Sequence, residues 1–198
     1  MPSWISPRAG AGFGLLAILV WLVLYFIAAA SRPGYDLRTN HVSDLGNPSS
    51  PGAWAFNAAC ILAGLLFLPF ALAIPGALAG RTAKAGGGLL IGAEAFLVLV
   101  GVFPEESPNN LHVLVSGGFF ILLLISAVVL AYPLHESKEF GHLAGYLAAA
   151  TAAASLATIV TRAEPFIEHI AVFLGLLWSA RAAGRMWAMG PRVGSVRS

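Results

Sequence analysis

Charged residues are scarce in this sequence. Asp, Glu, Lys and Arg together make up 10% of its 198 residues, whereas a soluble protein typically carries about 25%. So few charges cannot cover a water-facing surface, which excludes an ordinary soluble domain. Hydrophobic residues make up 58% of the chain and the mean hydropathy is +0.82. Much of the surface is therefore expected to face lipid.

Cysteine and basic residues are also few. The single cysteine, Cys60, excludes an intrachain disulfide and a zinc site built from cysteines. The formal charge is only +2, from 11 Lys and Arg against 9 Asp and Glu, and these basic residues are too dispersed for a nucleic-acid footprint. Glycine is frequent, but the sequence contains no Walker, Rossmann or Gly-x-Ser-x-Gly pattern. We therefore expect no nucleic-acid partner and no phosphate loop.

Long apolar runs are the main positive feature. Each is roughly 18–25 residues long, the length that crosses about 30 Å of hydrocarbon as a helix. Backbone amides in lipid must be satisfied within the segment, so helices are the expected form. The sequence predicts an all-α, polytopic membrane protein, a single domain over residues 1–198 with six transmembrane helices. The predicted spans are 12–30, 53–78, 87–103, 111–132, 142–161 and 166–187.

The basic residues predict the orientation of these spans. Six crossings place both termini and the second and fourth connections on one side, which holds eight of the Lys and Arg residues. The other side holds three, Arg32, Arg38 and Arg162. Because the cytoplasmic side of a membrane protein is enriched in Lys and Arg, we expect both termini to be cytoplasmic and the protein to lie in the cell membrane. The eight are Arg8, Arg81, Lys84, Lys138, Arg181, Arg185, Arg192 and Arg197.

Polar side chains gather at the opposite, extracytoplasmic ends of the spans. Residues 40–47 join the first two spans and form the most polar stretch of the N-terminal half. The fourth and sixth spans begin on the same side. Six side chains that are distant in sequence are therefore predicted to share one rim: His41, Ser43, Asp44, His112, Glu168 and His169.

Several short motifs resemble a known family. They are the run Asn-His-Val-Ser-Asp-Leu-Gly at 40–46, the Trp-Ala-Phe-Asn at 54–57 that opens an apolar helix, the Gly-Val-Phe-Pro at 101–104, and Glu168 at the start of a last helix that contains Trp178. Together they resemble a domain-of-unknown-function family of six-helix bacterial and archaeal membrane proteins, related to the FRAG/DRAM-type membrane proteins. The resemblance implies six helices and an outer site that involves Ser43, Asp44, His112 and Glu168. Members often carry a basic residue after the Glu, where this chain has His169.

A divalent metal is the first hypothesis for this rim. Imidazole and carboxylate groups together are a common ligand set for zinc and other divalent metals. The predicted ligands are His41, Asp44, His112 and His169, and the predicted catalytic residues are Glu168 and Ser43. A bound metal could activate water against a lipid or small amphiphile. Taken singly, however, each residue is more often an ordinary polar side chain at a wet helix end, where acidic groups favour the N-terminus.

Two other functions are compatible with the same residues. His112 and His169 lie on different helices at similar depth, as the axial ligands of a haem b would, which predicts a redox protein. A lipid- or partner-binding protein without an enzymatic activity is the third possibility.

Two polar features lie within the spans themselves. Glu94 is near the middle of the third span, where an ionisable residue must face the bundle interior or a cavity. The fifth span carries a polar stripe of Thr151, Ser155, Thr158 and Arg162. We interpret these groups mainly as interhelical contacts, with Glu94 neutral and hydrogen-bonded to a hydroxyl. The alternative is a path for a proton or substrate. Arg162 is expected to pair with Asp44, Glu164 or Glu168.

Overall fold

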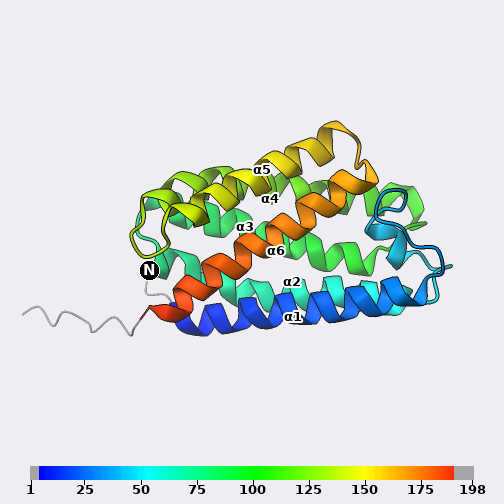
Figure 1. Cartoon of the computed structure of the whole chain (residues 1–198), viewed down its shortest axis with the longest axis horizontal. Coiled ribbons are helices and arrows are strands. Elements are labelled where there is room, and N and C mark those ends of the chain that lie inside the picture. The colour runs from blue at the N-terminus through cyan, green and yellow to red at the C-terminus, as the bar shows by residue number, and fades with distance from the viewer. Residues whose placement is uncertain (1–4, 190–198) are drawn as a thin grey trace, which may run out of the picture.

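Six long α-helices follow one another along the chain (Figure 1). The structure is a computed structural model and describes residues 5–189. Two short 3-10 turns lie in the connections, η1 (Ser43–Gly46) and η2 (Pro108–Asn110). Each predicted span forms one helix, which confirms the all-α, six-helix prediction. The helices are α1 (Pro7–Ser31), α2 (Ala53–Ala77), α3 (Arg81–Val102), α4 (Leu111–Glu136), α5 (His142–Val160) and α6 (Pro165–Ala188).

Local sequence signals account for several helix ends. Pro7 and Pro165 occupy the first turns of α1 and α6, where the missing amide hydrogen of proline costs no helical bond. The Glu164 side chain caps α6 by accepting from the amide of Ile167 at 2.9 Å, as expected for an acidic residue at this end. Helix α2 continues past both of its prolines, Pro69 and Pro75. Helices α3 and α4 extend beyond their predicted apolar runs because the flanking polar residues remain helical.

The helices form a closed ring. Each helix packs against the next along the chain, and α6 also packs against α1. One end of the bundle carries the start of α1 and the end of α6, and the α1–α2, α3–α4 and α5–α6 connections lie at the other end (Figure 1). We call the latter end the rim. The basic residues Arg192 and Arg197, which contribute to the predicted orientation, lie outside the described residues.

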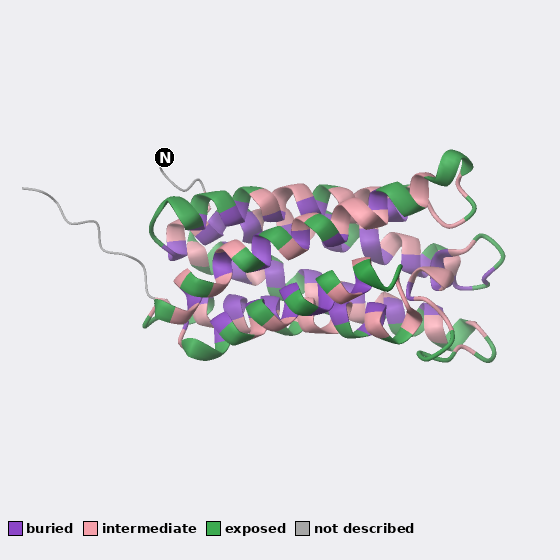
Figure 2. Cartoon of the chain, turned by 90° about the horizontal axis from the view of Figure 1, so that it is seen from above, coloured by how far each residue is buried: buried purple, intermediate pink, exposed green. Residues whose placement is uncertain are grey.

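The outer surface of the ring is apolar. Buried and exposed residues alternate along every helix (Figure 2), and the exposed ones include large hydrophobic side chains such as Phe26, Val113 and Val160. All six helices are long and apolar enough to cross a membrane. Side chains of this kind are stable on a surface that lipid covers, so the chain is a multi-pass membrane protein.

Close packing between α2 and α3 fixes the position of Glu94. A Cβ atom added at Gly64 of α2 would lie 2.7 Å from Val98 Cγ2 and 2.8 Å from the backbone oxygen of Glu94. Only glycine allows the two backbones to approach so closely, as is common between membrane helices. This contact places Glu94 at the inner wall of the ring, with 6% of its surface exposed.

Candidate functional site

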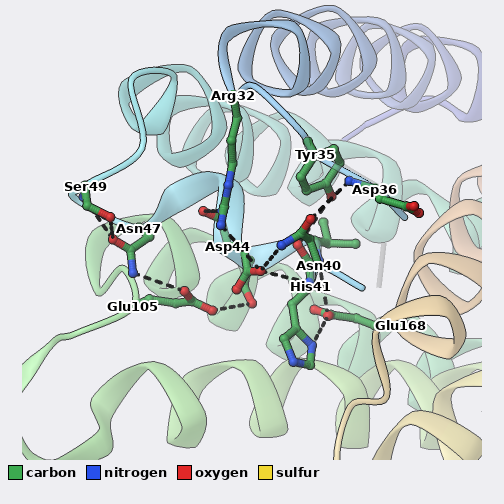
Figure 3. Close-up of polar contacts among 12 residues, drawn as sticks. Arg32, Tyr35, Asp36, Asn40, His41, Asp44, Asn47, Ser49, Glu105 and Glu168 are labelled. Atoms are coloured by element: carbon green, nitrogen blue, oxygen red, sulfur yellow. Dashed lines mark hydrogen bonds and ion pairs between the residues drawn. The ribbon is translucent and has the colours of Figure 1, made fainter. Parts of the chain in front are cut away.

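Asp44 organises the connection between α1 and α2. Its Oδ2 accepts hydrogen bonds from the His41 amide at 3.1 Å and from Asn40 Nδ2 at 3.3 Å, and it lies 3.9 Å from Arg32 Nη2. Arg32 Nη1 also donates to the Asp44 carbonyl at 2.5 Å (Figure 3). The carboxylate thus stabilises the conformation of the loop. Its salt-bridge partner is Arg32 and not the predicted Arg162.

Glu168 attaches this loop to α6. The residue is buried in the first turn of the helix, and its Oε2 accepts from His41 Nδ1 at 3.1 Å and from the Val42 amide at 3.2 Å (Figure 3). The hydrogen bond to Glu168 raises the pKa of His41 above its usual value, because a carboxylate favours the charged imidazolium. His41 and Glu168, both predicted site residues, are therefore brought together as a hydrogen-bonded pair.

Ser43 attaches the loop to the α3–α4 connection. Its hydroxyl donates to Glu105 Oε1 at 2.9 Å, and Asn47 Nδ2 donates to Glu105 Oε2 at 3.4 Å and to Glu106 Oε1 at 3.2 Å. Glu105 lies just beyond the Phe-Pro motif noted in the sequence. The rim is consequently a hydrogen-bonded layer that joins the α1–α2 and α3–α4 connections and the first turn of α6.

The two histidines predicted to bind a cofactor have different surroundings. His112 Nδ1 donates to the Phe103 carbonyl at 2.8 Å, so in the neutral ring Nε2 is the acceptor nitrogen. His169 is buried, with Nδ1 2.8 Å from the Pro165 carbonyl and Nε2 2.8 Å from the Tyr35 hydroxyl. Burial raises the pKa of that tyrosine. His112 lines the internal cavity described below, whereas His169 bonds to the first turn of its own helix through Nδ1 and to Tyr35 of the α1–α2 loop through Nε2.

The predicted metal ligands do not form one set. Asp44 is paired with Arg32 and His41 with Glu168, while His112 and His169 bond to separate parts of the backbone. Over residues 5–189, no group of three or more His, Cys, Asp or Glu side chains is arranged to hold a metal ion. The haem hypothesis gains no support either, since His112 lines the internal cavity and His169 is not among its lining residues. Each Nδ1 is instead bonded to a backbone carbonyl, that of Phe103 for His112 and that of Pro165 for His169.

An internal cavity extends from the rim into the bundle. Its rim end, which we call the mouth, is lined by Val42, Ser43, His112 and Glu168; Glu94 lies part of the way along the wall, and Ser179 lies toward the far end. Between them the wall is almost entirely apolar and comes from α1, α2, α3, α4 and α6. The cavity volume is about 80 Å³, counted as space open to the centre of a water molecule. One water needs about 10–15 Å³ by this measure.

Glu94 is the polar group that stands out on the cavity wall. Among the described residues, its Oε2 is buried without a hydrogen-bond partner. The hydroxyl partner expected from the sequence is not found: Thr151 and Thr158 donate to carbonyls of their own helix, at 2.8 and 3.0 Å, and Ser155 Oγ is itself buried without a partner within the described part of the chain. Glu94 thus faces the cavity with an unpaired oxygen, and none of the stripe residues Thr151, Ser155, Thr158 and Arg162 lines that cavity.

Sequence reasoning missed most of the cavity wall. Trp21, Phe56 and Phe67 look like ordinary apolar residues within spans, and no pattern marks them as neighbours of Glu94. Tyr35 and Arg32 also gave no signal, since a lone polar residue in a loop has many possible partners. Glu105 could have been identified from its position directly after the Gly-Val-Phe-Pro motif.

Comparison with known proteins places the chain in a family. No curated protein and no solved structure matches it. Residues 15–185 match the model of a family described as proteins of unknown function (DUF998), a match that includes all of the rim and cavity residues. The chain therefore belongs to the DUF998 family, as its sequence motifs predicted.

Proposed function

We propose that this protein binds a slender small amphiphile inside the helix ring. The observation that carries the proposal is the cavity itself, which is polar at its mouth and apolar along its wall. Ligand sites are typically concave and mostly apolar, with a few polar groups that fix orientation. A hydrocarbon chain would contact the wall, and the mouth would remain in contact with water.

The depth of the cavity supports a ligand with a single chain. On α6 the wall runs from Glu168 to Ser179, which corresponds to about 16 Å at 1.5 Å per residue. The hydrocarbon core of a bilayer is about 30 Å thick, so this depth is close to that of one leaflet. A chain that spans one leaflet would therefore reach the far end of the cavity.

The width of the cavity limits the size of the ligand. A volume of about 80 Å³ by the water-centre measure has room for roughly five to eight waters. This is compatible with one thin chain, and it is small for a porphyrin or for a lipid with two chains. The predicted catalytic residues Ser43 and Glu168 would shape the mouth through their bonds to Glu105, His41 and Val42.

Quenching of Trp21 fluorescence by a brominated chain tests this function. Trp21 lies on the cavity wall, and its signal is isolated as the difference between the wild type and a Trp21→Phe variant in phosphatidylcholine nanodiscs. A bromodecyl amphiphile should quench that signal and saturate at low concentration. Linear quenching, identical to that of an exposed tryptophan, would show that the chain only dissolves in lipid.

A pair of glycine substitutions provides the matched control. Gly175 lies on the cavity wall, and an added Cβ would make only ordinary contacts there, at 3.7 Å from Leu123 and 3.8 Å from Thr151. Gly175→Leu should fill the space and abolish saturable quenching. Gly117 is outside the wall, and its added Cβ would meet nothing within 4 Å, so Gly117→Leu should bind as the wild type does. Loss of quenching in both variants, or in neither, would contradict the proposal.

A further inference from the structure

The cavity wall carries acidic residues but no Lys or Arg among the described residues. Two carboxyl residues line it, Glu94 and Glu168. Glu168 already accepts two hydrogen bonds at the mouth, whereas Glu94 Oε2 has no partner. His112 Nε2 can accept a hydrogen bond whenever that ring is neutral, since Nδ1 carries the hydrogen donated to Phe103. The unpaired polar atoms that face the cavity are therefore suited to a ligand that donates hydrogen bonds or carries a positive charge.

The cost of burying a charge limits which ligands Glu94 can bind. An isolated carboxylate at this depth is costly, so Glu94 carries a proton unless a cation lies beside it. A divalent metal requires four or more ligands, and a single unpaired carboxyl residue on the cavity wall cannot supply them. An ammonium group needs only a few acceptors, and its alkyl chain suits an apolar wall.

Aromatic rings provide a second feature suited to a cation. Five of them line the cavity, and the face of an aromatic ring attracts a cation that lies within about 6 Å of its centre. They come from three of the helices, so a cation moving from the mouth toward Glu94 would pass between rings. The five residues are Trp21, Phe56, Phe67, Phe119 and Phe120.

We propose that Glu94 binds the ammonium group of a slender organic amine and exchanges it for a proton. This inference rests on the proposed function and specifies the chemical class of the amphiphile. When the ammonium ion arrives, the Glu94 proton leaves to water, so the net charge inside the cavity does not change. The alkyl chain then lies along the apolar wall toward the mouth.

Three ligands with the same brominated chain test the inference. Bromodecylammonium, bromodecanol and bromodecanoate are titrated into nanodiscs, and quenching of Trp21 is measured. The loss of one charge-assisted hydrogen bond corresponds to about tenfold to a hundredfold in affinity. We expect the ammonium compound to bind tighter than the alcohol by that factor, and Glu94→Gln to remove the difference while alcohol binding is retained.

A second carboxyl variant separates local from general charge effects. Glu136 is exposed at the opposite end of α4 from His112, so Glu136→Gln should keep the full preference for the ammonium compound. Equal binding of all three ligands, unchanged by Glu94→Gln, would overturn the inference and leave the proposed function intact. If none of the ligands quenches Trp21 saturably, the proposed function fails and this inference fails with it.

The pH dependence tests the exchange. An alkylammonium group resembles that of Lys, with a pKa near 10.4, and so stays charged between pH 5 and 8. Competition by the Glu94 proton should weaken its binding as the pH falls, by up to about tenfold per unit. The other titratable groups on the wall are Cys60 of α2, His112 of α4 and Glu168 of α6, and neither α1 nor α5 contributes one. The dependence should disappear in Glu94→Gln, and its persistence there would overturn the exchange.

Discussion

Removal of the Glu168 carboxylate should release the α1–α2 loop from α6. In Glu168→Ala both bonds to the loop are lost, and the Val42 amide, on a residue only 3% exposed, is left without its acceptor. A hydrogen bond to a charged group contributes about 1.5–3 kcal/mol. The His41 contact is worth less, because 37% of that side chain is exposed and water screens the pair. We therefore expect the docked loop to lose about 2 kcal/mol.

Hydrogen exchange measures this loss directly. A change of about 2 kcal/mol corresponds to roughly thirtyfold faster exchange of the loop amides, which mass spectrometry can follow in a peptide covering residues 40–46. Glu168→Gln retains an acceptor oxygen for Val42 and should have a smaller effect. Glu136→Gln, at the other end of the bundle, should have none. Unchanged protection of the loop in Glu168→Ala would refute the inferred role of this carboxylate.

Three further predictions concern the rim and the packing of the ring. By NMR, His41 should titrate above about 6.5, and its midpoint should fall in Glu168→Gln; an unchanged midpoint would contradict the pairing. Because folding raises this pKa, the pair stabilises the protein fully below about pH 6.5 and less as the pH rises through the pKa of the folded state. Arg32→Met should increase hydrogen exchange of the loop amides by less than Glu168→Ala does, because the ion pair of Arg32 with Asp44 is partly exposed and such pairs contribute about 0–1 kcal/mol. An equal or larger increase would contradict this ranking. Gly64→Leu should lower the melting temperature by separating α2 from α3, whereas Gly88→Leu, where an added Cβ meets nothing within 4 Å, should not; similar melting temperatures would argue against tight packing.

The sequence was sufficient for the helices and for the position of the rim. Apolar runs long enough to cross a bilayer leave helices as the only stable form, and their alternating direction brings Ser43, His112 and Glu168 to the same end. All three do line the mouth of the cavity. This part of the site follows from the topology alone, which does not depend on how each helix is rotated about its axis.

The pairing of rim residues depends on rotation about each helix axis, which hydropathy does not reveal. Neighbours on an α-helix point about 100° apart, so Glu168 lines the cavity while His169 contacts Tyr35. The sequence prediction placed both in one site, His169 as a ligand and Glu168 as a catalytic residue. Glu94 was correctly expected to face the interior, but its hydroxyl partner was wrong, because threonines in helices often bond to their own backbone.

The contact between α6 and α1 has a consequence for how this molecule is made. These are the first and last helices within residues 5–189, and their contact completes the wall around the cavity. An enclosed interior cannot exist on a nascent chain that lacks its final helix. Until α6 inserts, the side of the cavity that α6 covers lies open, and Glu94 with it.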